Sequence, residues 1–137
     1  MPRNATDVAH YLDSSALVKL VVAEAETVAL RGWLESADRT PVSSDLARTE
    51  LMRAVRRAAP DRVVQARAVL DAITLVQIAT STYEEAGRLD PAAPRTLDAI
   101  HLAAALELGD DLDTIVTYAD RLAEAAKSNG IPVTAPA

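Results

Sequence analysis

Residues 8–20 have the sequence VAHYLDSSALVKL. The apolar-leaning run at 8–12 is typical of a short strand, and Ser14 is a good cap for a helix over 16–22. Asp13 stands between the two, where the expected strand ends and the expected helix begins. A carboxylate at such a boundary is costly near a core unless a cation or hydrogen bonds compensate its charge. The segment therefore predicts a strand–helix unit with a candidate functional acid at its junction.

The alternation of short strand-like segments with longer helical ones continues along the chain. Further strands are expected at residues 40–43, 74–78, 114–117 and 131–134, and further helices at 25–35, 44–57, 60–72, 82–88, 96–108 and 119–128. The expected helix caps include Ser43 or Ser44 and Thr96. This pattern predicts one α/β domain over residues 1–137, with a mostly parallel sheet of four or five short strands and helices on both faces.

The composition limits the class of protein. Half of the 137 residues are hydrophobic and Phe is absent, so the core must be built from Ala, Leu, Val and Ile. A net charge of −6 argues against binding nucleic acid by basic charge alone, but is compatible with a nuclease that uses metal ions. With no Cys and only two His, a zinc site is not expected. The N-terminal residues lack a signal-peptide core and no apolar run approaches membrane-spanning length, so we expect a cytoplasmic protein without a membrane partner.

Two further acids interrupt apolar patterns. Glu50 flanks the apolar stripe of a helix, and Asp98 opens the segment TLDAIHLAAAL, which is apolar on nearly every side. Each acid also has a structural explanation. Asp13 is a possible helix cap, Glu50 a partner for Arg53, and Asp98 is favoured by the helix dipole. Their joint placement nevertheless favours one shared Mg²⁺ or Mn²⁺ ion, because these ions take carboxylate oxygens and water, and such a site suits phosphate chemistry.

Four segments resemble the PIN-domain ribonucleases, in particular the VapC toxins of bacterial toxin–antitoxin pairs. They are YLDSSALVKL at 11–20, TELMRAV at 49–55, RTLDAIHLAAAL at 95–106 and TYADRLAEAA at 117–126. The resemblance implies a Rossmann-like sheet, Mg²⁺- or Mn²⁺-dependent RNA cleavage, neutralisation by a VapB-type antitoxin and a homodimer. It maps three family acids to Asp13, Glu50 and Asp98, which are the predicted catalytic residues and metal ligands.

The fourth family acid does not carry over in the same way. The family pattern is Thr-x-Asp, whereas here Thr117 and Tyr118 are followed by Ala119, and the acid comes one position later as Asp120. A shift of one residue at a helix start turns a side chain by about 100°. Three interpretations stay open. Asp120 substitutes after a small backbone adjustment, three acids are sufficient, or Ala119 is a natural or engineered loss that weakens activity.

Several polar residues are weaker candidates. Arg53 and Arg57 are placed to contact RNA phosphates, with a solvated helical face as the alternative. Ser14 and Thr117 are candidates for hydrogen bonds to a metal-bound water or a carboxylate, or for helix caps. His101 lies one turn after Asp98 in an apolar helix, where a hydrogen-bonded core histidine is a better interpretation than a catalytic base.

The predicted function is a metal-dependent endoribonuclease toxin, with Asp13, Glu50 and Asp98 at the metal and Asp120 as a fourth catalytic residue. The alternative is a catalytically impaired PIN-fold protein that acts by binding RNA or an antitoxin. A two-component receiver is rejected because no Lys follows the last expected strand. A haloacid-dehalogenase-type phosphatase is rejected because the first strand is not followed by Asp-x-Asp.

Overall fold

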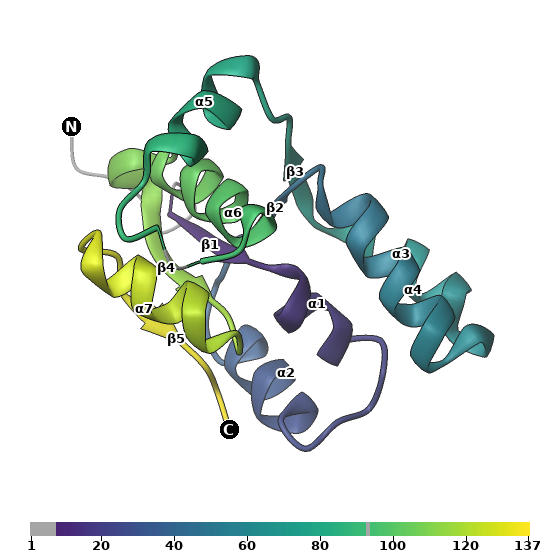
Figure 1. Ribbon diagram of the computed structural model, residues 1–137. Helices are drawn as coiled ribbons and strands as arrows, with labels where there is room; N and C mark the ends of the chain where they lie inside the picture. Colours follow the sequence, from purple (N-terminus) through teal and green to yellow (C-terminus); the bar gives the residue numbers. More distant parts are fainter. Residues whose placement is uncertain (1–7, 93) are drawn as a thin grey trace.

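The computed structural model describes residues 8–92 and 94–137 (Figure 1). Five strands form one sheet in the order β3-β2-β1-β4-β5, and every neighbouring pair is parallel. Their bounds are β1 (Ala9–Leu12), β2 (Pro41–Ser44), β3 (Thr74–Val76), β4 (Leu112–Val116) and β5 (Val133–Thr134). β1 is central, and its Tyr11 pairs with Val42 on one side and Ile115 on the other.

Helices connect the strands on both faces of the sheet. They are α1 (Ser14–Lys19), α2 (Thr27–Glu35), α3 (Ala47–Ala58), α4 (Val63–Ala72), α5 (Thr80–Arg88), α6 (Thr96–Leu106) and α7 (Asp120–Ser128), with short 3-10 turns at Pro60–Arg62 and Gly109–Asp111. Figure 1 shows α3 and α4 side by side, extending away from the sheet. Among the described residues, no helix is long and apolar enough to cross a membrane.

Two hydrophobic cores follow from the alternation of side chains along the strands. Tyr11 and Ile115 pack in the core under α6 and α7, whereas their neighbours Leu12 and Val116 pack in the core under α1 to α4. Successive residues of a strand point to opposite faces, so one short strand contributes to both cores. Each fully buried Leu or Ile contributes roughly 1.5–3 kcal/mol to folding.

The predicted α/β class and each predicted strand and helix are found, with ends displaced by a few residues. The cap predicted as an alternative at Asp13 is confirmed, whereas the other predicted helix caps were wrong. Asp13 rather than Ser14 caps α1, Ser43 and Ser44 are buried in β2, and Thr96 is the first residue of α6 rather than its cap. Pairing with β3 explains the second error, because it extends β2 through both serines.

The chain order places a topological switch point beside β1. From β1 the chain passes through α1 and α2 to β2 on one side, and it later reaches β4 on the other side. In open parallel sheets, ligands bind at the carboxyl ends of strands that flank such a point. Asp13 follows β1 and Thr117 follows β4, so these two residues mark the expected binding edge.

Candidate active site

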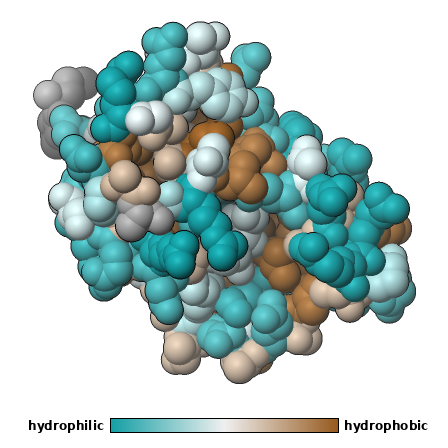
Figure 2. Space-filling view, viewed as in Figure 1, coloured by the Kyte–Doolittle hydropathy of each residue, from teal (hydrophilic) through white to brown (hydrophobic). Residues whose placement is uncertain are grey.

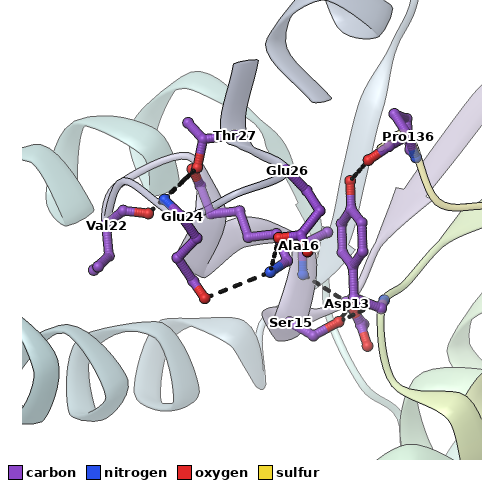
Figure 3. Close-up of polar contacts among 10 residues, drawn as sticks. Asp13, Ser15, Ala16, Val22, Glu24, Glu26, Thr27 and Pro136 are labelled. Atoms are coloured by element: carbon purple, nitrogen blue, oxygen red, sulfur yellow. Dashed lines mark hydrogen bonds and ion pairs between the residues drawn. The ribbon is translucent and has the colours of Figure 1, made fainter. Parts of the chain in front are cut away.

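Asp13 is the most deeply buried acid of the site, with 3% of its surface exposed. Its Oδ1 accepts hydrogen bonds from the Ser15 hydroxyl at 2.6 Å and from the Ala16 backbone N–H at 3.1 Å. Its Oδ2 accepts one from the Thr117 hydroxyl at 2.7 Å. Figure 3 shows Asp13 beside Ser15 at the start of α1. A carboxylate has about four lone-pair positions, so these three donors leave room for one further partner.

Burial dominates the electrostatics of Asp13. It raises the pKa of this carboxyl above its usual value, and hydrogen bonds from Ser15 and Thr117 offset the increase only in part. Desolvation disfavours the charged form of an acid, whereas a nearby cation favours it. Asp13 is therefore an acid whose ionised form would be stabilised by a bound cation.

The segment after β4 is anchored against α1. The Ser15 hydroxyl accepts a hydrogen bond from the Tyr118 backbone N–H at 3.0 Å, and the Tyr118 hydroxyl donates to the carbonyl of Pro136 at 2.7 Å. The ammonium group of Lys19 lies 4.7 Å from the centre of the Tyr118 ring and forms an ion pair with Glu26 at 2.8 Å. These contacts fix the backbone that carries Thr117 next to Asp13.

Glu50 has an unexpected partner. Its Oε1 lies 2.6 Å from Nε2 of His101, and 17% of the Glu50 side chain is exposed. The Nδ1 atom of His101 lies 2.7 Å from the Tyr11 hydroxyl. Glu50 forms no ion pair with Arg53 among the described residues, so the surface-pair interpretation is wrong. His101 is a hydrogen-bonded buried histidine, as the sequence indicated, but its partner is a candidate catalytic acid.

An open cleft of about 590 Å³ brings several predicted residues together. Its lining includes the acids Glu50, Asp98 and Asp120, together with Arg95, Thr96, Leu97, Ala119 and Arg121. Asp98 is half-buried in the first turn of α6, and Asp120 is exposed at the first position of α7. Ala119 is the N-cap of α7 and its side chain makes no capping hydrogen bond. Two positions for the fourth acid, Ala119 and Asp120, therefore border the same cleft.

A second groove of about 500 Å³ shares Glu50 and Leu97 with this cleft. Its remaining lining residues are Ser14, Ser15, Val18, Leu46, Thr49, Arg53, Ala54 and Arg57. The predicted contact residues Arg53, Arg57 and Ser14 thus lie beside the acids. Figure 2 shows hydrophobic surface beside α1, next to the hydrophilic side chains that cover α3.

The donor set suits a hard divalent cation, because the candidate ligands are all carboxylates. Within residues 8–92 and 94–137, however, no group of three or more His, Asp or Glu side chains is arranged closely enough to hold a metal ion. Mg²⁺ often binds through only one or two carboxylates and completes its coordination with water and substrate phosphate. Of the three predicted ligands, Glu50 and Asp98 line the cleft, whereas the buried Asp13 is not among its lining residues. These acids fit a site in which the substrate supplies part of the coordination.

Sequence reasoning missed the contacts of Ser15 and His101, and it did not single out Arg95 and Arg121, which line the cleft. Ser15, rather than Ser14, donates to Asp13, and its place two residues after the acid was the signal for a local hydrogen bond to the cap. The contact of His101 with Glu50 joins residues 51 positions apart, and no spacing rule within one helix predicts it.

The fold and the site define a recognisable class of protein. A family profile described as PIN domain matches residues 10–128. The chain is 47% identical over 127 residues to ribonuclease VapC46 of Mycobacterium tuberculosis (strain ATCC 25618 / H37Rv), covering 92% of this chain and 96% of that protein. It is 38% identical over 130 residues to ribonuclease VapC47 of strain CDC 1551 / Oshkosh, with the same two coverages. The chain belongs to the PIN-domain family, and within it to the VapC ribonucleases.

Solved structures agree with this assignment at the level of the fold. VapC20 of Mycobacterium tuberculosis, described as a toxin that cleaves the sarcin-ricin loop, superposes with a TM-score of 0.76 at 15% identity, over 93% of this chain and 100% of that one. A chain of a toxin–antitoxin complex from Klebsiella pneumoniae gives a TM-score of 0.71 at 21% identity, over 94% of this chain and 98% of that one.

Proposed function

We propose that this protein is a Mg²⁺- or Mn²⁺-dependent endoribonuclease and the toxin of a toxin–antitoxin pair, acting in the cytoplasm. The observation that carries the proposal is the cleft lined by Glu50 and Asp98, together with Asp13, a buried acid of raised pKa at the carboxyl end of β1. The 47% identity to a ribonuclease over nearly the whole chain supports RNA as the substrate.

The acids and the residues that hydrogen-bond to them have separate roles in the proposed phosphodiester hydrolysis. Asp13, Glu50 and Asp98 would hold the metal ion. When bound, the ion supplies an activated water and stabilises negative charge on the phosphate. Ser15 and Thr117 hold the Asp13 carboxylate in place by donating to both of its oxygens. No side chain is required as a nucleophile in this reaction.

Exposed arginines suit the binding of an RNA backbone on both sides of the acids. Arg53 and Arg57 line the groove on the α3 side, and Arg95 and Arg121 line the acidic cleft on the other side. Guanidinium groups contact phosphate oxygens through paired hydrogen bonds. These four side chains would position the scissile phosphate over Glu50 and Asp98 despite the net charge of −6.

The same cleft suits inhibition by a partner. We propose that a VapB-type antitoxin covers the groove beside α1 and inserts a basic side chain between the acids, because Arg pairs well with carboxylates. The Klebsiella pneumoniae neighbour is a toxin–antitoxin complex, which supports this class of partner. Self-association as a homodimer is part of the proposal and is tested by the mass of the purified protein in solution.

A second candidate function is favoured by one residue. Ala119 lines the cleft at the position where the resemblance expects an acid, and Asp120 is exposed. A chain with weakened chemistry would act by binding RNA or the antitoxin instead. Substituting Ala119→Asp separates the two functions. A large gain in cleavage supports the impaired protein, and unchanged cleavage supports a competent three-acid site.

RNA cleavage assays with added Mn²⁺, added Mg²⁺ or a chelator test the primary proposal. We expect cleavage with either ion, none with the chelator, and a loss of more than about 100-fold in Asp98→Asn. The matched control is Asp113→Asn, the same chemical change at a half-exposed acid near the start of β4. Full cleavage in the chelator, or equal activity of the Asp98 and Asp113 variants, would contradict the proposal.

A further inference from the structure

A chain of short hydrogen bonds connects the centre of the sheet to the cleft. It runs from the Tyr11 hydroxyl on β1 to Nδ1 of His101 on α6 at 2.7 Å, and from Nε2 of His101 to Oε1 of Glu50 on α3 at 2.6 Å. Tyr11 and His101 are almost fully buried, whereas Glu50 is partly exposed at the cleft. Three separate elements therefore meet at one histidine.

The chemistry of Tyr11 and Glu50, at the two ends of this hydrogen-bond chain, sets the direction of its hydrogen bonds. The Glu50 carboxylate can only accept a hydrogen bond, so the proton between it and His101 belongs to Nε2, whereas the Tyr11 hydroxyl carries a proton that it can donate to Nδ1. In a neutral imidazole, the tautomer that donates Nε2–H leaves Nδ1 as an acceptor for the Tyr11 hydroxyl. Nε2–H therefore faces the Glu50 carboxylate, which accepts.

We propose that His101 is a positioning residue for Glu50. It holds Oε1 through an Nε2–H donor whose tautomer Tyr11 fixes, and it leaves Oε2 available to the cleft. This inference rests on the proposed metal-dependent cleavage, in which Glu50 is a metal ligand. A carboxylate that is oriented before the metal arrives loses less side-chain freedom on binding, and such supporting contacts typically change metal affinity or activity by about 10–100-fold.

The competing explanation is that the histidine only fills and satisfies the core. A hydrogen bond to a charged group stabilises a fold, so removal of His101 lowers stability under either explanation. Stability alone cannot separate them. Two measurements separate the explanations. One is the tautomer of His101, and the other is the behaviour of a variant that restores the N–H donor without the imidazole ring.

The first experiment measures the tautomer in metal-free protein. Nitrogen-15 NMR of the histidine side chains at pH 7.5 should show His101 protonated at Nε2 and unprotonated at Nδ1. The Tyr11→Phe variant deletes one oxygen and should give a mixture of tautomers, while the signals of His10 stay unchanged. A His101 ring that carries its proton on Nδ1 would overturn the proposal, and so would an unchanged tautomer in Tyr11→Phe.

The second experiment measures Mn²⁺ affinity by calorimetry and RNA cleavage on the same samples. We expect His101→Leu to lose about 10–100-fold in both, and His101→Gln, whose amide N–H can replace Nε2–H, to stay within a few-fold of the unsubstituted protein. His10→Leu is the matched control at an equally buried histidine. Near-normal binding and cleavage in His101→Leu, or equal losses in His101→Leu and His101→Gln, would overturn the proposal.

The two experiments also separate this inference from the proposed function. If the unsubstituted protein neither binds Mn²⁺ nor cleaves RNA, the proposed function fails, and the NMR result still decides the direction of the hydrogen-bond chain. If His101→Leu does not fold, Tyr11→Phe carries the test, with an expected few-fold loss of Mn²⁺ affinity. Full affinity together with an unchanged tautomer in that variant would overturn the inference.

Discussion

The two histidines of this chain have similar surroundings but lie on opposite faces of the sheet, with His10 beside Trp33 of α2 and His101 beside Tyr11. His10 is 4% exposed and His101 is 1% exposed. In each ring, Nδ1 contacts a hydrogen-bond donor and Nε2 faces an acid. His10 accepts from the backbone N–H of Thr40 at 3.1 Å and lies 3.5 Å from the carboxylate of Asp113, whose side chain is 52% exposed. The contacts of His101 are shorter, and its acid lines the cleft.

The roles proposed for the two histidines differ because of their positions in the fold, since the residue type is the same. The contacts of His10 join the starts of β1 and β4 to the residue before β2. Those of His101 lie near the carboxyl ends of the strands, where parallel sheets bind ligands. His10 and Tyr11 are neighbours in sequence, yet they lie on opposite faces of β1 because side chains alternate along a strand.

The largest expected effect distinguishes Asp13, at the carboxyl end of β1, from Asp113, near the start of β4. Asp13→Asn should lower RNA cleavage by more than about 100-fold, because it removes a buried ligand charge but keeps a residue that caps α1 well. Asp113→Asn should leave cleavage within two-fold, or about 0.4 kcal/mol. Initial rates of cleavage with saturating Mn²⁺ give the comparison. Similar losses in both variants would show that Asp13 contributes no more to cleavage than Asp113 does.

The next effect concerns stability rather than chemistry. His10→Leu leaves the Thr40 N–H without its acceptor, so we expect the free energy of unfolding to fall by about 1–3 kcal/mol. Cleavage per folded molecule should be unchanged. Urea unfolding and active-fraction measurements test this, and a loss of cleavage as large as that of His101→Leu would remove the distinction between the two histidines.

The pH dependence of stability gives a further test at Asp13. The pKa of Asp13 is raised in the folded state, so its contribution to stability is complete below the pKa of the unfolded chain and is lost as pH rises through the folded pKa. In a chelator, Asp13→Asn should therefore gain stability relative to the unsubstituted protein as pH increases. Melting temperatures across this range test the sign. Addition of Mn²⁺ should reverse the gain, because only the carboxylate binds the ion strongly.

The smallest expected effect is at Ala119, the uncapped start of α7. Asp is a good N-cap residue, so Ala119→Asp should stabilise the protein by about 1 kcal/mol, independently of any change in cleavage. A matched substitution, Arg121→Asp, adds an acid to the same helix without a cap and should gain less. Lower stability in Ala119→Asp would show that the partly buried position does not tolerate a carboxylate.

The sequence was sufficient for the class of fold and for the acids that end a strand or begin a helix. Asp13 and Asp98 sit at such boundaries, and a parallel sheet brings these boundaries to one edge. Glu50 was placed correctly beside the buried stripe of α3. Its partner was not, because the meeting of α3 with α6 depends on how the two helices pack, and helical periodicity does not encode packing between helices.

The cap errors have a local cause. Ser43 and Ser44 have good capping propensity, but pairing with Leu75 and Val76 draws them into β2, so tertiary structure overrides the local preference. Their hydroxyl oxygens are buried and have no hydrogen-bond partner of standard geometry among the described residues. In the sequence, two serines at the end of a strand look the same as two serines at the start of a helix.

A crystal soaked in Mn²⁺ tests the central claim most directly, because anomalous density locates the ion itself. We expect a single strong peak between the carboxylates of Asp13, Glu50 and Asp98, with at least two of them at about the 2.0–2.2 Å that hard divalent cations require or one water away. The Asp13→Asn crystal, soaked in the same way, should lose the peak. A peak elsewhere on the protein, or none at a saturating concentration, would contradict the assignment of these acids to a metal site.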